Sequence, residues 1–309
     1  MKDFTKSKFS FVKKFKIFGV ISLILAGIGL GCFLATVFGA SPFNFDIEFA
    51  GGVKSIYALG VDVDRTVTEE LDSIVYDVTG AHASSIQATG TDGQSVQIKT
   101  LELDSETRDA LFTAIQEAYP GAEIIDSGYI SATVGDDLKA AAVKASLLAI
   151  LLILVYITIR FEFRSGLAAV LTLCHDICVM MAFFAIFQLP INMNFIAAAL
   201  TILGYSINAT IVIFDRIREN SKGIEDNKIF AEIADRSILQ TIARSINTSL
   251  TTLIPIVLIL ILGVPSIQNF AIALIVGIVS GTYSSVFIAG PLWVTLKKLG
   301  KKNAEKAKA

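Results

Sequence analysis

Long apolar stretches alternate with polar segments along this chain, and six of the apolar stretches are long enough to cross a membrane. A transmembrane helix needs about 20 predominantly apolar residues to span a hydrocarbon core of about 30 Å. The six predicted spans cover residues 15–39, 140–159, 166–187, 193–214, 244–262 and 267–296. We therefore predict an α-helical membrane protein with six transmembrane helices.

The first apolar stretch, residues 15–39, follows a basic segment, as the core of a cleaved signal peptide also does. Its apolar run is longer than the roughly 7–15 residues of such a core, and no A-x-A cleavage site closes it. Gly27 and Gly31 form a G-x-x-x-G spacing, which favours close packing against another helix. We interpret this segment as a retained membrane anchor.

The polar segment between the first two spans shows the short periodicities of strands and amphipathic helices. A capping box at Thr66–Glu69 starts one predicted helix and Gly80 ends it, while Asp104 caps a second helix that stops at Pro120. The predicted strands lie at 45–49, 53–61, 84–88, 95–100 and from about 123, with a hairpin turn at 90–93. This order predicts an inserted α+β domain of the split β-α-β, ferredoxin-like type.

The composition agrees with a membrane protein, because 53% of the 309 residues are apolar, 17% are charged and the mean hydropathy is +0.66. Soluble domains carry about 25% charged residues, which excludes an ordinary soluble protein, and the apolar content excludes a disordered one. The net charge of −2 is the sum of opposite blocks. Residues 41–139 hold 18 acidic and five basic residues, whereas residues 1–16 and 297–309 each hold six lysines and one acidic residue.

Basic residues also mark two of the links between spans, namely the link with Arg160 and Arg164 and the segment after the fourth span. The links 188–192 and 263–266 carry no charge. Because segments rich in lysine and arginine stay in the cytoplasm, both termini are expected there. The predicted organisation is a cytoplasmic N-terminus 1–14, an extracytoplasmic domain 40–139, a cytoplasmic loop 215–243 and a cytoplasmic tail 297–309. Within that loop, 224–239 suits an interfacial helix or a plain connecting helix equally well.

The chain lacks the motifs of common ATPases and hydrolases, namely G-x-x-x-x-G-K-[ST], H-E-x-x-H and G-x-S-x-G. Its three cysteines form no disulfide framework, and the cluster Cys174, His175, Asp176 and Cys178 matches no usual zinc spacing. The acidic domain argues against nucleic acid, whose phosphates need a basic surface. We predict no enzyme activity, no cofactor, no metal and no nucleic-acid partner. Energy for any work would come from a partner or an ion gradient.

Polar side chains inside the spans are the remaining candidates for function. His175 and Asp176 are adjacent near the middle of the third span. The other polar positions are Tyr205, Ser206, Asn208 and Thr210 in the fourth span, Arg244, Asn247, Thr248, Thr251 and Thr252 at helical spacing in the fifth, and Ser280, Tyr283 and Ser284 in the sixth. These groups either form interhelical hydrogen bonds or line a polar seam that conducts an ion.

Several longer motifs point to one family. They are Asp46–Gly52 (D-I-E-F-A-G-G), Val134–Leu138, Ile159–Arg164, His175–Asp176, Gly204–Asn208 (G-Y-S-I-N), Phe214–Asn220 and Arg244–Leu253. Together they resemble the SecF family of the bacterial Sec protein-export machinery, within the RND transporter superfamily. The resemblance covers nearly the whole chain.

The resemblance implies a multi-pass protein of the bacterial cell membrane, surrounded by lipid and paired with SecD beside the SecYEG channel. It implies a role in moving unfolded exported polypeptides at the outer face, driven by a proton or sodium gradient. In the family, an acid after the asparagine of the G-Y-S-x-N run and an arginine in the fifth span carry protons. Arg244 resembles that arginine, but the acid position is occupied by Ala209.

Because alanine carries no proton, we consider three alternatives and favour the first. An acid of the partner carries the coupling, with Arg244 as its nearby positive charge. Alternatively, oxygens of Asn208, Ser206 and Thr210 bind sodium, or Asp176 replaces the missing acid. The ion-path candidates are thus Arg244, Asn208, Ser206, Thr210, Asp176, His175 and Thr251. Two other functions stay open, half of an RND exporter for a small molecule or lipid, and a scaffold without transport.

Overall fold

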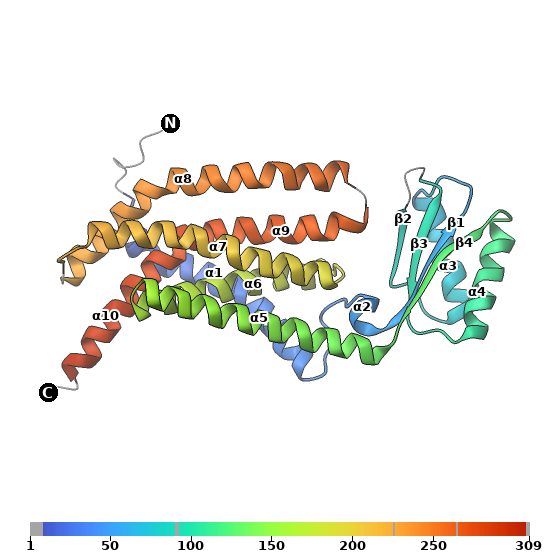
Figure 1. The fold of residues 1–309 in the computed structure, drawn as a ribbon, viewed down its shortest axis with the longest axis horizontal. Helices are drawn as coiled ribbons and strands as arrows, with labels where there is room; N and C mark the ends of the chain where they lie inside the picture. Colours follow the sequence, from blue (N-terminus) through green and yellow to red (C-terminus); the bar gives the residue numbers. More distant parts are fainter. Residues whose placement is uncertain (1–8, 90–92, 225, 264, 307–309) are drawn as a thin grey trace.

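The computed structural model describes residues 9–89, 93–224, 226–263 and 265–306. Figure 1 shows a bundle of long helices at one end of the molecule and an α+β domain at the other. Within these residues, six helical segments are long and apolar enough to cross a membrane, so the predicted architecture of six spans with an inserted domain is confirmed.

The spans are longer than the apolar stretches that predicted them. Their bounds are α1 Phe11–Val37, α5 Ala132–Arg160, α6 Phe163–Ile186, α7 Met193–Asn220, α8 Asn227–Leu262, and α9 Pro265–Ser284, which continues through a π-helical turn at Ser285–Ala289 into α10 Gly290–Lys306. Within segment 215–243, residues 215–220 and 227–243 are therefore helical, and the first part of α8 is continuous with the fifth span. Two side-chain hydrogen bonds connect the end of α7 to the first part of α8. Arg216 Nε donates to Gln240 Oε1 at 2.7 Å, and Asn220 Nδ2 donates to Ser237 Oγ at 2.9 Å.

Three helices form the interior of the bundle and three lie outside it. In the most apolar stretch of each span, 50% of the residues of α6, 39% of those of α7 and 61% of those of α9–α10 are buried, against 11% for each of α1, α5 and α8. The outer helix α1 packs on α6 at Gly29, where a Cβ atom would lie 1.8 Å from the carbonyl oxygen of Cys178. A Cβ at Gly27 or Gly31 would contact nothing. The G-x-x-x-G pair therefore does not make this close packing.

The inserted domain has the predicted order of elements. Its elements are β1 Gly52–Ala58, α3 Arg65–Thr79, β2 Ser85–Thr89, β3 Ser95–Thr100, α4 Ser105–Ala118 and β4 Glu123–Ile130. The four strands pair antiparallel in the order β2-β3-β1-β4, which is the split β-α-β arrangement. Leu71 and Val75 of α3 and Ile115 of α4 are fully buried against the sheet. The two helices cover the face of the sheet that points away from the bundle (Figure 1).

Two local predictions in this domain are wrong. Residues 45–49 are not a strand, because Asp46 caps the short helix α2 (Ile47–Ala50) by accepting the Ile47 amide at 2.8 Å. The cap of α3 is Asp64, which accepts the Val67 amide at 2.9 Å, and not Thr66. Gly80, in the left-handed region, does end α3, and Asp104 does cap α4. Residues 90–92 of the predicted turn lie outside the described residues.

Candidate functional site

Asp176 is fully buried in the centre of the bundle and forms four hydrogen bonds. Its Oδ2 accepts from Ser206 Oγ at 2.6 Å and Ser284 Oγ at 2.9 Å. Its Oδ1 accepts from Ser280 Oγ at 2.8 Å, and Nδ1 of His175 lies 3.0 Å away. A carboxylate offers about four lone-pair positions, so these partners fill them all.

The donors come from three helices that approach closely at this level. Asp176 and His175 belong to α6, Ser206 to α7, and Ser280 and Ser284 to α9. Glycines on α9 allow the approach. A Cβ at Gly277 would lie 2.4 Å from a side-chain carbon of Ile202, and one at Gly281 would lie 3.0 Å from Ser206. The serines at i and i+4 of α9 thus reach one carboxylate.

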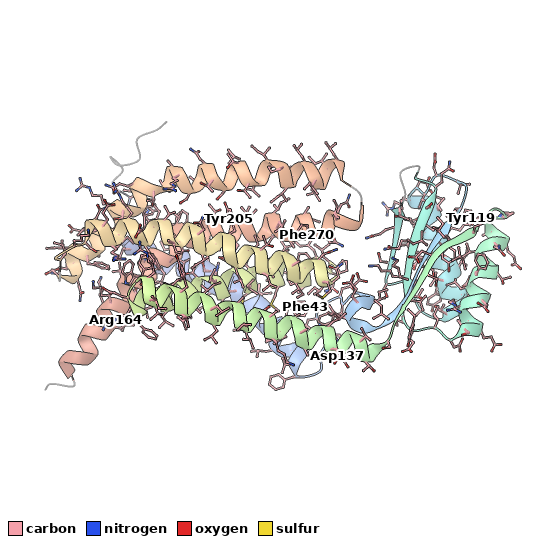
Figure 2. The ribbon with its side chains drawn as sticks, in the orientation of Figure 1. Phe43, Tyr119, Asp137, Arg164, Tyr205 and Phe270 are labelled. Carbon is pink, nitrogen blue, oxygen red and sulfur yellow. The ribbon has the colours of Figure 1, made fainter. Side chains whose placement is uncertain are left out.

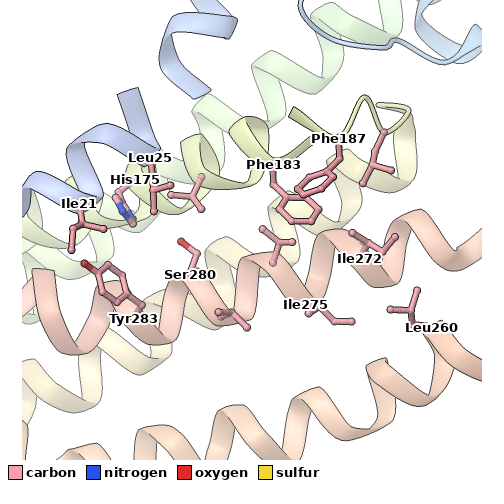
Figure 3. A pocket seen from close by; sticks show the side chains of 14 residues that line it. Ile21, Leu25, His175, Phe183, Phe187, Leu260, Ile272, Ile275, Ser280 and Tyr283 are labelled. Atoms are coloured by element: carbon pink, nitrogen blue, oxygen red, sulfur yellow. The ribbon is translucent and has the colours of Figure 1, made fainter. Parts of the chain in front are cut away.

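His175 is nine-tenths buried, and its Nε2 has no hydrogen-bond partner among the described residues. The side chain lines a pocket of 710 Å³ between α1, α6, α8 and α9, shown in Figure 3. Ser280 and Tyr283 are the other polar side chains of this pocket, whose remaining walls are apolar. The hydroxyl of Tyr283 donates to the Phe18 carbonyl of α1 at 3.1 Å.

A second polar group lies on the opposite side of α7, toward α8. Asn208, Ala209 and Arg244 line a small pocket of 110 Å³ together with Tyr205, Val212, Ser245 and Thr248. Arg244 and Asn208 are both exposed, and Arg244 has no ion-pair partner in the described part of the chain. Arg244 therefore lies next to position 209, as the family resemblance implies, but it forms no ion pair with a carboxylate of the described residues.

Other hydroxyl groups connect α7, α8 and α9 through hydrogen bonds that involve neither Asp176 nor Arg244. Tyr205 (labelled in Figure 2) donates to Ser249 Oγ of α8 at 2.9 Å, and Ser249 lies 2.6 Å from Thr282 Oγ1 of α9. Thr251 donates to carbonyls of its own helix and is exposed. Thr210 is buried, with a hydroxyl that has no partner among the described residues. The predicted seam is thus divided into separate groups.

The three oxygens considered for sodium are not brought together. Ser206 points to Asp176 in the interior, while Asn208 faces Arg244 on the exposed side of α7. Of the named candidates, the structure joins His175, Asp176 and Ser206. The sequence signal for Ser280 and Ser284 was their spacing of four on an apolar helix, which alone did not show their common acceptor.

The junction between the two parts of the molecule depends on residues that sequence reasoning assigned only to a motif. Asp46, 3% exposed, pairs with Lys99 of β3 at 2.6 Å and accepts from Asn192 Nδ2 of the α6–α7 link at 3.3 Å. Gly52 has φ of +150°, and a Cβ there would lie 2.2 Å from the Thr100 carbonyl. The D-x-x-F-x-G-G segment is thus the joint between domain and bundle.

The family model described as protein export membrane protein SecD/SecF, C-terminal, matches residues 111–299. The chain is 39% identical over 262 residues to the protein translocase subunit SecF of Sebaldella termitidis, covering 84% of each chain. It is 34% identical over 294 residues to SecDF of Thermus thermophilus, covering 94% of this chain but 39% of that protein. The crystal structure of SecDF from that organism matches with a TM-score of 0.79 at 33% identity, covering 95% of this chain and 39% of that one.

Proposed function

Because this chain belongs to the SecF family of bacterial multi-pass membrane proteins, we propose that it is an accessory subunit of protein translocation. Its relatives include single proteins named SecDF, of which this chain matches slightly more than a third. A fused relative supports association of the unfused halves. The proposed partner is therefore a SecD chain, beside the SecYEG channel, with unfolded exported polypeptides as substrate.

The exposed polar face of α7 and α8 carries the proposal of a partner. An arginine that faces lipid is unfavourable, by about 2.5–3.5 kcal/mol at the centre of a span and less toward its ends, and Arg244 is the first residue of the predicted fifth span. Arg244 of α8 lies beside Asn208 and Ala209 of α7, and its side chain is exposed in the single chain. A second membrane protein with an acidic side chain would cover this face and pair with the guanidinium.

We further propose that an acid of this partner, and not a group at position 209, carries the ion-gradient coupling of the unit. The arginine stabilises the ionised form of a nearby carboxylate.

The proposed orientation follows from charge, with both termini in the cytoplasm and the α+β domain outside, since the segment of that domain carries 18 acidic and five basic residues.

The test is export into vesicles that contain this chain, its partner and the channel, with proton and sodium gradients removed separately. Arg244→Ala is expected to abolish most of the gradient-dependent part of export. Arg236→Ala, which removes an exposed arginine of the same helix outside the predicted span, is the matched control. Ala209→Asp is expected to leave the coupling ion unchanged, and a switch of ion in this variant would contradict the partner-acid account.

Two outcomes would favour other functions. Export unaffected by Arg244→Ala would indicate a scaffold without transport. Purification from native membranes as a homotrimer, without a SecD-like chain, would indicate half of an RND exporter. Recovery with a SecD-like chain and the channel supports the proposal, and reporter fusions to each terminus test the orientation.

A further inference from the structure

A pocket of 340 Å³ lies at the end of the bundle far from the α+β domain, where the α5–α6 link meets α7, α8 and α10 (Figure 1). Its charged lining residues are Arg160 of α5, Arg218 of α7, Lys297 of α10 and Glu162 of the link, which makes three positive charges against one negative charge. Asp215 does not line this pocket and lies 3.6 Å from Arg160, but both side chains are about half exposed, and such ion pairs are weak. The pocket therefore keeps an excess of positive charge.

Two of these cations are positioned by aromatic rings and backbone, and not by carboxylates. Arg218 Nη1 donates to the Arg160 carbonyl at 3.0 Å, and the guanidinium carbon of Arg218 lies 5.7 Å from the centre of the Phe161 ring. Lys297 Nζ lies 4.0 Å from the centre of the Phe230 ring. Cation–π contacts hold a cation in place without neutralising its charge. Neither Arg218 nor Lys297 forms an ion pair with a residue that the structure describes.

Trp293 of α10 adds a buried hydrogen-bond donor to the same pocket. Its side chain is 3% exposed, and its ring packs against those of Phe214 and Phe230, at 4.9 and 5.5 Å between ring centres. The indole Nε1–H has no acceptor among the described residues. An indole nitrogen only donates, and a buried donor without an acceptor is unfavourable. An anion with several acceptor oxygens would satisfy this donor and both cations at once.

An exposed apolar stripe on α5 begins at this pocket. Ile159 lines the pocket, and Val155, Leu152 and Leu148 follow it along the helix toward the α+β domain. Residues spaced by three and four positions share one face of a helix, and all four side chains are exposed. Because α5 is an outer helix of a membrane bundle, this stripe is open to lipid tails. A soluble anion would contact the pocket alone, whereas a phospholipid would contact both the pocket and the stripe.

We propose that the pocket binds the phosphate group of an anionic phospholipid, whose acyl chains lie along the α5 stripe. Arg218 and Lys297 supply charge-assisted hydrogen bonds to the phosphate oxygens, and Trp293 Nε1–H supplies a neutral one. The excess of positive charge selects a headgroup with net negative charge, because a zwitterionic headgroup brings a cation that the pocket repels. The bound lipid thus contacts the α5–α6 link, α7 and α10 together.

Tryptophan fluorescence tests this proposal at the pocket itself, because Trp293 is the one tryptophan of the chain. The full-length protein is placed in phosphatidylcholine vesicles that contain either phosphatidylglycerol or phosphatidylcholine with brominated acyl chains, which quench a nearby indole. We expect brominated phosphatidylglycerol to bind at least about fivefold more tightly than brominated phosphatidylcholine, the effect of one basic residue near a membrane surface. Equal affinities would overturn the proposal.

Inorganic phosphate, added in large excess, separates a lipid headgroup from a soluble anion. We expect it to leave the quenching by brominated phosphatidylglycerol unchanged, because it does not contact the stripe. Relief of the quenching would overturn the assignment to a lipid and indicate a site for a soluble phosphate.

Neighbouring lysines of α10 provide a matched pair of variants. Lys297→Gln is expected to weaken the binding of phosphatidylglycerol about fivefold. Lys298→Gln removes the same charge from an exposed side chain outside the pocket, and it is expected to leave this affinity nearly unchanged. Equal losses in the two variants would show that the lipid responds only to the overall charge, and would overturn the pocket.

The role of the indole donor needs a readout other than fluorescence. Trp293→Phe keeps an aromatic ring and removes the N–H, and native mass spectrometry of the full-length protein measures its affinity for phosphatidylglycerol. A loss of about fivefold is expected for one hydrogen bond, and an unchanged affinity would contradict the role of Nε1–H. These measurements need no transport, so their results are independent of the proposed export function.

Discussion

The ion pair between Asp46 and Lys99 connects the α+β domain to the membrane bundle, and Asp46→Asn is the sharpest test of that joint. The two charged atoms are 2.6 Å apart, and the side chains are 3% and 13% exposed. Asp46 also caps α2 and accepts from Asn192. Asparagine keeps the size of the side chain and removes its charge.

The expected cost follows from burial. Removing one partner of a buried pair typically costs about 3–5 kcal/mol, because the other charge stays uncompensated. Lys99 keeps some solvent contact, which places Asp46→Asn near the lower end, at about 3 kcal/mol. At 1.4 kcal/mol per factor of ten, local opening of the joint becomes roughly 100-fold more frequent.

Hydrogen–deuterium exchange with mass spectrometry, on the full chain in nanodiscs, measures this opening at α2 and β3. The control is Asp126→Asn, which removes the Lys54–Asp126 pair of the same sheet, 3.4 Å long and 36% and 56% exposed. Exposed pairs contribute about 0–1 kcal/mol, so exchange in the control is expected to rise less than about fivefold. Equal exchange in the two variants would refute the argument that burial makes the Asp46 pair strong.

Two further predictions follow from the packing of α1 and the core of the α+β domain. Gly29→Ala is expected to lower the melting temperature in detergent, because its methyl group meets the Cys178 carbonyl, while Gly27→Ala leaves it unchanged or raises it through helix propensity; equal melting of both variants would contradict the α1–α6 contact. Burial and the hydrogen bond to Glu70 raise the pKa of Tyr119 to about 12, from 10.0. The folded state therefore holds this proton longer than the unfolded state, and the resulting stability, complete below pH 10, is lost as the pH rises toward 12. Tyr119→Phe should lose less stability than the parent between pH 10 and 12 in heat-unfolding curves, and an unchanged pH dependence would argue against the raised pKa.

Local patterns in the sequence were enough to predict the spans and the order of elements in the inserted domain. Apolar length, helical spacing and caps such as Asp104 depend on neighbours along the chain, so they can be identified before folding. The same reasoning failed at residues 45–49, where an apolar alternation suggested a strand. There the Asp46 cap and its contacts with Lys99 and Asn192, distant in sequence, produce the helix α2 instead.

The polar groups inside the membrane show most clearly what cannot be predicted from the sequence alone. Helical geometry alone places Ser206 and Asn208 about 200° apart around α7, so the sequence separates them. It does not say which side meets which helix. Only the packing of α6, α7 and α9 directs Ser206, Ser280 and Ser284 to Asp176 and leaves Arg244 on an exposed face.

The sequence by itself therefore determined that this is a six-span membrane protein with an acidic α+β insert. It also determined that an alanine, Ala209, stands where the resemblance to the family implies an acid. The tertiary structure decided that Asp176, the acidic residue within the predicted spans, lies at the centre of a hydrogen-bond cluster formed by α6, α7 and α9. The physical reason is that apolar length is a local property, whereas the partner of a buried charge depends on how helices rotate and pack against one another.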